Sequence, residues 1–509
     1  MQNQSSNTRI AKNTLALYFR MLLNMVVVFY TSRIVLDALG VEDYGIYNVV
    51  GGIVYLLTFL NTAMSSATQR FLTFEIGKRS DLKRMTNVFS TSLNIHVLIS
   101  LVILIFSETV GFYVLNTYIV IPYERMFAAN WVYQCSVVSC CLGIMFLPYT
   151  AIIISYERMR VFAWISISDV VLKLVVAYLL YVTAYDKLVV YSSLILLVSM
   201  ITPVIYYSYC RKNFLECKFK RVKDRVLFKD MCNFAGWNLI GNMAYMGFTQ
   251  GVNILLNVFF GPVVNAARGV AVQVQGAVGQ FSRNFQMAVN PQITKKYADG
   301  DMKGMHTLLY RSSKFSFFLL LIISLPIILQ TEKILNWWLV DVPDHTINFF
   351  RIIICISMID VLSLPLNIAS QATGNIKKFQ LVEGSTLLLI VPTAYLILKI
   401  YPVPEIVFIV HFFIAIIAQV FRIFLLKKMI GLVIREYLRL VVFRSMLVLM
   451  STILIIGCID VLFLNKLDNF FLTSLFSIIL TLGISFLVGL TKEEKICIVD
   501  KIKQIHARL

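Results

Sequence analysis

Long apolar runs, each separated from the next by a short polar connection, recur along the whole of this chain. A helix needs about 20 apolar residues to cross the hydrocarbon core of a bilayer, so a chain of 509 residues has room for many such helices. Only 14% of the residues are charged and 59% are hydrophobic, which means that much of the folded surface must itself be apolar. The pattern predicts an all-α polytopic membrane protein.

Fourteen runs are long enough to span a membrane, and their short connections predict that neighbouring spans form antiparallel hairpins. Twelve spans is the alternative count, because the edges of apolar runs are hard to place. The expected spans are approximately 12–34, 44–70, 85–112, 125–152, 160–183, 187–209, 230–257, 264–290, 308–330, 346–372, 378–400, 404–426, 438–462 and 469–490. They group into an N-lobe (1–210), a basic linker (211–229), a C-lobe (230–428), two additional spans (429–490) and an amphipathic tail (491–509).

Lysine and arginine are concentrated in every second connection. By the positive-inside rule these connections face the cytoplasm, which places both termini there and requires an even number of spans. The same clusters account for much of the net charge of +19, so a nucleic-acid partner is not expected. The basic connections contain Lys78 to Arg84, Arg158 and Arg160, the linker 211–229, Lys295 to Lys303, Lys377 and Lys378, and Lys427 to Arg435.

The two halves of the chain carry a weak repeat at an offset of about 220 residues. The segment RIVLDALG, which ends at Gly40, matches NILLNVFFG, which ends at Gly261. The segment around Asp81 likewise matches the segment around Asp301. Because the copies are an even number of spans apart, we expect parallel repeats related by an axis along the membrane normal. This predicts two six-helix lobes around a central cavity.

Polar side chains form stripes on single faces of the spans that begin the two halves. A charge in the hydrocarbon costs a few kcal/mol at least, so these residues should face a wet cavity or a partner. Hydrogen bonding between helices is the structural alternative for the amides, and snorkelling to the interface is the alternative for Arg20. The stripes comprise Asn13, Arg20, Asn24 and Thr31 in the first span, the residues that lead to Arg70 in the second, Asn238, Asn242, Tyr245, Thr249, Asn253 and Asn257 in the seventh, and Arg268, Gln275, Gly279, Arg283 and Gln286 in the eighth.

Three further candidates are acids within expected spans. Asp169 precedes Lys173 by four residues, which favours a structural ion pair over proton coupling. Asp360 and Glu383 are isolated acids in the tenth and eleventh spans. Each is a candidate ion-coupling group or a residue of a hydrated packing niche.

No sequence motif for catalysis or for binding a cofactor accompanies these stripes. The chain has no Walker loop, no H-E-x-x-H, no G-x-S-x-G and no dinucleotide fingerprint. The nine cysteines form no C-x-x-C pair and the five histidines do not cluster, so neither a metal nor another cofactor is expected. An enzyme is therefore not the expected function.

Residues 32–53, SRIVLDALGVEDYGIYNVVGGI, resemble the polysaccharide-transporter (Wzx-type) flippases of the multidrug/oligosaccharidyl-lipid/polysaccharide (MOP) superfamily. The shared features are an arginine (Arg33) and a later Leu-Gly (Leu39 and Gly40) at the end of the first span, a short acidic loop, and Tyr-Gly-x-Tyr at the start of the second span. The resemblance covers essentially the whole chain. It implies transport of an undecaprenyl-pyrophosphate-linked oligosaccharide across the bacterial inner membrane by alternating access, for the synthesis of O-antigen or capsule.

The resemblance also implies that cationic residues line the transport cavity. By position these are Arg20, Arg33, Arg70, Arg268 and Arg283, accompanied by the amides of Asn24, Asn242 and Asn253. The implied partners are the lipid-linked oligosaccharide, membrane lipids and the glycan polymerase or ligase machinery. A peptidoglycan-precursor flippase or a multidrug or cation antiporter of the same fold is the alternative. A membrane-embedded glycan polymerase is less favoured, because it would be expected to carry a large extracytoplasmic loop.

Cysteine accessibility tests the predicted topology. In a variant without native cysteines, we expect Lys220→Cys to react with a membrane-impermeant maleimide only from the cytoplasmic side and Pro343→Cys only from outside. Reaction of both positions from the same side would contradict the assignment of the basic connections to the cytoplasm.

Overall fold

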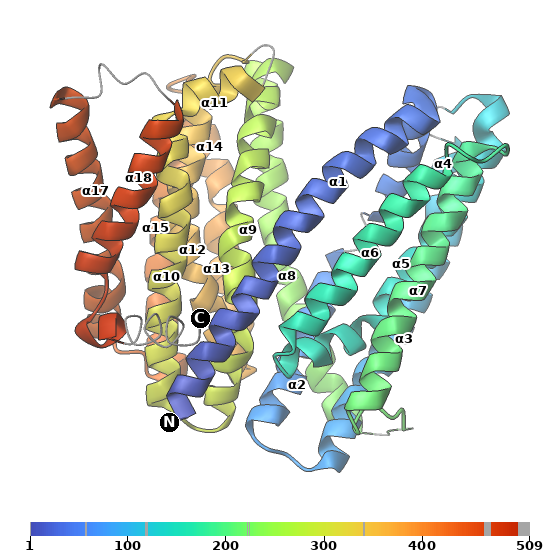
Figure 1. Ribbon diagram of the computed structural model, residues 1–509, viewed down its shortest axis with the longest axis horizontal. Helices are drawn as coiled ribbons and strands as arrows, with labels where there is room; N and C mark the ends of the chain where they lie inside the picture. The colour runs from blue at the N-terminus through green and yellow to red at the C-terminus, as the bar shows by residue number, and fades with distance from the viewer. Residues whose placement is uncertain are drawn as a thin grey trace, which may run out of the picture. The chain divides into compact units, whose positions relative to one another are not determined.

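The computed structural model describes residues 2–55, 59–117, 121–220, 222, 224–338, 342–462 and 470–496. Every regular element within these ranges is a helix (Figure 1). The α-helices are α1 (Gln2–Tyr55), α2 (Phe59–Gly77), α3 (Leu82–Phe106), α4 (Phe112–Thr117), α5 (Met126–Ser155), α6 (Met159–Leu179), α7 (Lys187–Asn213), α8 (Arg225–Phe260), α9 (Pro262–Ala298), α10 (Met302–Leu329), α11 (Thr331–Trp338), α12 (Thr346–Thr373), α13 (Lys377–Leu388), α14 (Ile390–Leu398), α15 (Ile406–Ile430), α16 (Ile434–Tyr437), α17 (Phe443–Leu462) and α18 (Phe470–Ile484).

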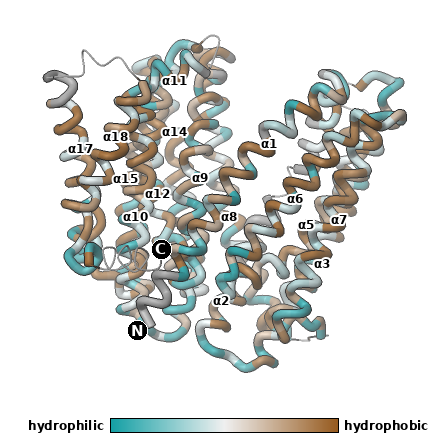
Figure 2. The backbone as a smooth tube through the Cα atoms, in the orientation of Figure 1, coloured by the Kyte–Doolittle hydropathy of each residue, from teal (hydrophilic) through white to brown (hydrophobic). Residues whose placement is uncertain are grey.

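Eleven segments of the described chain are long and apolar enough to cross a membrane. Hydrophobic residues occupy the middle parts of these helices, and hydrophilic residues gather at their ends and turns (Figure 2). The chain is therefore a multi-pass membrane protein with an all-α fold, as the apolar runs predict. The eleven segments are Arg9–Gly40, Leu82–Thr117, Tyr123–Ser155, Met159–Leu179, Lys187–Asn213, Met302–Leu329, Thr346–Thr373, Lys377–Leu398, Ile406–Ile430, Ile434–Cys458 and Phe470–Gly489.

Three of the fourteen predicted spans are not among these eleven. The predicted span 44–70 runs across residues 56–58, which lie outside the described residues. The predicted spans 230–257 and 264–290 correspond to α8 and α9, helices of 36 and 37 residues that are long enough to cross a membrane. These two helices carry the polar stripes of the seventh and eighth spans, and their polar residues explain why they are too hydrophilic to count as apolar spans.

The described chain divides into two compact units. Unit 1 comprises Met1–Asn242 and Met287–Gly300, and unit 2 comprises Met243–Gln286 and Asp301–Leu509. Within unit 1, α5 packs against α1, α2, α3 and α7, and α1 packs against α6. Within unit 2, α12 packs against both α10 and α15, and α17 and α18 pack against α10. Helices α8 and α9 each have one part in unit 1 and one part in unit 2.

The local backbone repeats at the offset that the sequence predicts. Gly40 and Gly261 both have a positive φ, at 78° and 81°. A residue with a side chain would be strained there, so glycine is suited to breaking the chain between the first and second helices of each half. Asp81 and Asp301 both cap the helix that follows, because the carboxylate of Asp81 accepts a hydrogen bond from the Arg84 amide and that of Asp301 accepts one from the Gly304 amide. Both of the matched pairs are thus equivalent in local structure.

A buried carboxylate, Glu157, connects three segments of unit 1 at the turn between α5 and α6. Its side chain is fully buried and accepts from Arg9 Nε at 2.7 Å, Lys295 Nζ at 2.6 Å and Gln292 Nε2 at 2.7 Å. Asn13 Nδ2 donates to the backbone carbonyl of the same residue at 2.9 Å. Glu157 therefore holds the start of α1 and the end of α9 to the α5–α6 turn. It also accounts for Asn13 structurally, without a role in a polar stripe.

The C-terminal segment contributes a second buried acid, Glu494, to unit 2. Residues 492–496 are helical, and Glu494 accepts a hydrogen bond from Lys314 Nζ of α10 at 2.6 Å. Lys314 is 2% exposed and Glu494 is 6% exposed, so each charge is neutralised by the other. Thr491 and Glu494 form a reciprocal capping box at the start of this turn. The predicted amphipathic tail is described only to Ile496, and residues 497–509 lie outside the described residues.

Glu157→Gln tests the importance of the buried carboxylate. The neutral amide would leave Arg9 and the largely buried Lys295 without their anion, and breaking a buried ion pair costs about 3–5 kcal/mol. We expect a clear drop in melting temperature in detergent and partial recovery in Glu157→Gln/Lys295→Gln. The control, Glu124→Gln, replaces an exposed acid and should melt like the wild type. Equal melting of Glu157→Gln and the control would mean that Glu157 does not stabilise unit 1.

Candidate functional site

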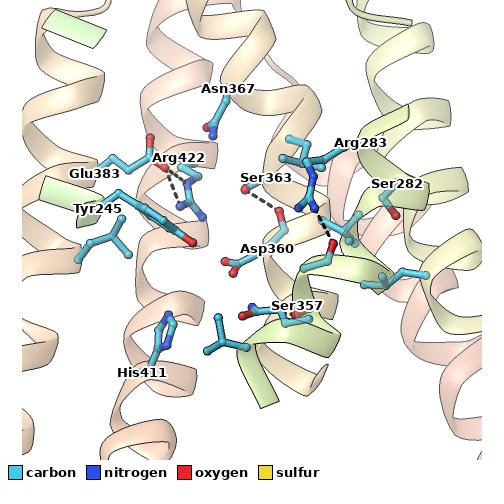
Figure 3. Close-up of a pocket in the computed structure, with 18 of the residues that line it drawn as sticks. Tyr245, Ser282, Arg283, Ser357, Asp360, Ser363, Asn367, Glu383, His411 and Arg422 are labelled. Atoms are coloured by element: carbon cyan, nitrogen blue, oxygen red, sulfur yellow. Dashed lines mark hydrogen bonds and ion pairs between the residues drawn. The ribbon is translucent and has the colours of Figure 1, made fainter. Parts of the chain in front are cut away.

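A cavity of about 360 Å³ lies inside unit 2. Its walls come from α8, α9, α10, α12, α13 and α15, and five of these six helices contribute polar or charged side chains (Figure 3). The polar lining comprises Tyr245, Gln275, Ser282, Arg283, Ser357, Asp360, Ser363, Asn367, Glu383, His411 and Arg422.

Arg422 of α15 and Glu383 of α13 form a buried ion pair at one side of this cavity (Figure 3). The Nε and Nη2 groups of Arg422 both donate to Oε1 of Glu383, at 3.0 and 2.7 Å, and Nη1 donates to Gln419 Oε1 at 3.3 Å. Arg422 is only 4% exposed, so an unpaired charge there would be costly. The prediction that Glu383 is an isolated acid is therefore wrong: its partner lies 39 residues further along the chain.

Asp360 of α12 is the acid of this cavity whose carboxylate has no ion-pair or hydrogen-bond partner in the described part of the chain. The hydroxyl of Ser363 donates to the backbone carbonyl of Asp360 and leaves the carboxylate unengaged. In the view of Figure 3, Asp360 lies between the Arg422–Glu383 pair and Arg283. The structure therefore places both predicted ion-coupling acids of the C-lobe in one cavity, of which only Asp360 is unpaired.

Arg283 of α9 lines the same cavity and donates from Nη2 to the backbone carbonyl of Gly276 at 2.7 Å. Within the described residues it has no carboxylate partner. Its neighbour in the stripe, Gln286, donates instead to Ser316 Oγ of α10 at 2.6 Å and is 3% exposed. The α9 stripe thus combines a cavity-lining arginine with an amide that forms an ordinary interhelical hydrogen bond.

Arg268 and Asn253 are two predicted binding residues that the structure brings together. Nη1 of Arg268 donates to Asn253 Oδ1 at 3.0 Å, and Nη2 donates to the backbone carbonyl of Thr249 at 3.0 Å. These contacts hold the guanidinium against α8. Asn253 and the backbone of Thr249, both on α8, thus position Arg268.

The predicted residues of unit 1 lie on α1 and α2, and their contacts are mostly aromatic. Arg20 Cζ lies 4.7 Å from the centre of the Phe162 ring, and Arg70 Cζ lies 4.7 Å from the Phe74 ring and 5.7 Å from the Phe234 ring. An aromatic face stabilises a guanidinium while leaving its edge available for hydrogen bonds.

The remaining predicted residues have simpler surroundings. Asn24 Nδ2 lies 3.5 Å from Ser166 Oγ, Arg33 is exposed, and Asn242 is half-buried. Asp169 forms the predicted ion pair with Lys173, at 2.8 Å. That contact confirms the structural interpretation of Asp169 and supplies no observation for coupling.

Arg422 is the charged cavity residue that the sequence interpretation missed. Arg422 lies close to Lys427 and Lys428 in the sequence, so it looks like part of the basic cluster at the end of its span. A lone arginine in an otherwise apolar run was the available signal, but its partner on α13 cannot be derived from the spacing on α15. No group of three or more metal-ligating side chains occurs among the described residues.

Comparison with known proteins identifies the fold. Neither a protein-family model nor a curated protein matches the sequence. A MATE transporter crystallised in complex with MaD3S superposes with a TM-score of 0.71, at 14% identity over 83% of this chain and 97% of that chain. An outward-facing multidrug resistance transporter of the MATE family superposes with a TM-score of 0.70, at 14% identity over 83% and 96% of the two chains. This chain has the fold of the MATE transporters of the MOP superfamily.

Another structure with the MATE-like fold is a MOP-superfamily transporter from Pyrococcus furiosus, with a TM-score of 0.69 at 14% identity over 83% of this chain and 96% of that chain. Its binding pocket is described as reversed in polarity, with a different function suggested for it. The likeness in fold agrees with the resemblance found in the sequence. The polysaccharide-flippase subtype stays a prediction.

Proposed function

We propose that this protein is a transporter that moves an undecaprenyl-pyrophosphate-linked oligosaccharide across the bacterial inner membrane by alternating access. The observation that carries the proposal is the pair of arginines in unit 2, Arg268 and Arg283, which are held by an amide and by backbone carbonyls and form no ion pair with an acid among the described residues. In unit 1, Arg20 and Arg70 lie against aromatic rings.

The chemistry of such a cargo matches these arginines. A pyrophosphate group cannot enter hydrocarbon without its hydration shell, so the protein must replace the lost water with hydrogen-bond donors. A guanidinium stays charged in a low-dielectric site and can bind phosphate oxygens through two parallel hydrogen bonds. The polyprenyl tail is itself apolar and can stay in the lipid during transport.

The second candidate is a multidrug or cation antiporter with the same fold. The observation in its favour is the unengaged carboxylate of Asp360 in the unit 2 cavity, since an acid facing a cavity can bind a cation. The presence of Arg283 and Arg422 on the same lining disfavours a cationic cargo, because like charges destabilise each other at short range. A peptidoglycan-precursor flippase carries a cargo of the same chemistry and differs only in the glycan.

The energy source is proposed to be an ion gradient, with removal of the product by downstream enzymes as the alternative. Asp360 is the acid best placed to take up and release a proton or sodium ion, because it is unpaired. Asp169 is held by Lys173, so it is less available than Asp360.

Export of the glycan in cells tests the cargo and the arginines together. Deletion of the gene should make one lipid-linked glycan accumulate on the cytoplasmic face of the membrane, and the wild-type gene should reverse this. Arg20→Ala and Arg283→Ala should each fail to reverse it while the protein remains inserted and abundant. Lysine at either position should restore export only partly, because it keeps the charge but loses the bidentate geometry.

Arg160→Ala is the matched control, since it removes an exposed arginine in a predicted cytoplasmic connection and should export normally. Normal export by both alanine variants at positions 20 and 283 would exclude a role for these arginines. Accumulation of no lipid-linked glycan in the deletion strain would exclude the proposed cargo.

A further inference from the structure

The lining of the unit 2 cavity contains equal numbers of opposite formal charges. The guanidinium groups of Arg283 and Arg422 are matched by the carboxylates of Asp360 and Glu383, so the lining is neutral when both acids are ionised and His411 is neutral. A zwitterion would fit such a lining as it stands. An anion would fit it only after one or both acids have lost their charge.

The hydrogen bonding of the two arginines favours an anion. Arg422 directs two of its donors at one oxygen of Glu383, and Oε2 of that acid has no hydrogen-bond partner among the described residues. A side-on arginine–carboxylate pair would use both oxygens. Arg283 donates only to a backbone carbonyl within the described residues. Arg283 therefore keeps donors for a ligand, and Arg422 would gain Nε and Nη2 as donors when Glu383 loses its charge.

We infer that the unit 2 cavity is a phosphate-binding subsite that fills together with protons. Solvent protons bind the carboxylates of Asp360 and Glu383, the protonated Glu383 loses its attraction for Arg422, and Arg422 and Arg283 then hold the phosphate. When the phosphate leaves, both acids release their protons and Glu383 pairs again with Arg422. This inference rests on the proposed function in that the phosphate is the diphosphate of the lipid-linked cargo.

The surroundings of the two acids are consistent with proton uptake on phosphate binding. The side chain of Leu320 is the contribution of α10 to the cavity lining, and it carries no charge. Beyond the lining, Gln419 bridges Arg422 and the hydroxyl of Tyr437. The titratable or charged groups that line the cavity with the two acids are Tyr245 on α8, Arg283 on α9, and His411 and Arg422 on α15. Arg268 of α9 lies near Tyr245 and His411. With two arginines on the lining and a third nearby, each proton taken up by an acid leaves an excess of positive charge.

Direct binding to the purified full-length protein tests the inference. The probe is farnesyl-diphospho-N-acetylglucosamine, a diphosphate diester. Its charge stays near −2 at both acidic (about 5.5) and neutral (about 7.5) pH, because a second ionisation near pH 6 belongs to phosphate monoesters. Wild-type protein should bind it at least about tenfold more tightly at acidic pH. Titration calorimetry in two buffers of different ionisation heat should show proton uptake on binding.

Substitutions at Asp360, Glu383 and Arg422 distinguish a loss of phosphate binding from a loss of folding. Asp360→Asn and Glu383→Gln each fix one acid in a neutral form, so each should bind at neutral pH more tightly than the wild type and take up fewer protons. Arg422→Gln/Glu383→Gln removes both charges of the buried pair, which avoids an unpaired charge that could prevent folding. It should bind at least about tenfold more weakly than the wild type at acidic pH, and more weakly than Glu383→Gln at both pH values.

Glu405→Gln is the matched control in unit 2. Burial alone would raise the pKa of the Glu405 carboxyl, but hydrogen bonds from Asn348 and His345 bring it below its ordinary value. Glu405 does not line the cavity. The control should therefore keep the affinity and the pH dependence of the wild type.

The other outcomes decide between the remaining interpretations. UDP-N-acetylglucosamine, a diphosphate diester without a prenyl chain, should show the same pH dependence if the phosphate alone is recognised. A response limited to the farnesyl probe would assign the phosphate to a lipid. Equal wild-type affinity at the two pH values without proton uptake would overturn the subsite and leave the proposed cargo standing. Absence of binding at either pH would overturn both. Tighter binding of glycerophosphocholine at neutral pH would assign the cavity to a zwitterion.

Discussion

The cost of an ionised group in hydrocarbon is the constraint on which the interior of this protein depends. The structure meets that cost in several ways. Lys314 is paired with Glu494 and Glu383 with Arg422, so buried charges neutralise each other across neighbouring segments. Arg20 and Arg70 lie against aromatic rings. The exception is Asp360, whose carboxylate has no partner within the described residues and lines a cavity. An exception of this kind is where function is expected.

Features that depend on short stretches of chain could be predicted from the sequence. The Asp169–Lys173 pair follows from helical spacing, and the equivalence of Gly40 with Gly261 follows from a repeat that keeps a helix break in both halves. The apolar runs predict the spanning helices for a similar reason, because the composition of each run shows directly that its surroundings are lipid. The apolar signal is weaker in α8 and α9, the predicted spans 230–257 and 264–290, because polar stripes interrupt it.

Features that depend on packing between distant segments could not be predicted. Glu383 looked isolated because its partner Arg422 lies on another helix, and only the packing of α13 against α15 brings them together. Glu157 lies in a connection that the sequence marks only as basic, yet its side chain is fully buried among Arg9, Gln292 and Lys295. The sequence contains no local sign of burial at such a position. The cavity of unit 2 has the same origin, since its lining comes from six helices.

A reconstituted flipping assay tests most directly whether this protein, with its MATE-like fold, moves a cargo with a phosphate group. The purified protein would be reconstituted into liposomes that contain a short-chain prenyl-diphosphate oligosaccharide with a fluorescent label on the glycan. An impermeant quencher added outside would then show how much of the labelled lipid stays in the inner leaflet. We predict that vesicles with the protein lose nearly all of the fluorescence, whereas vesicles without it lose only the outer-leaflet fraction. An equal loss in the two preparations would contradict the account.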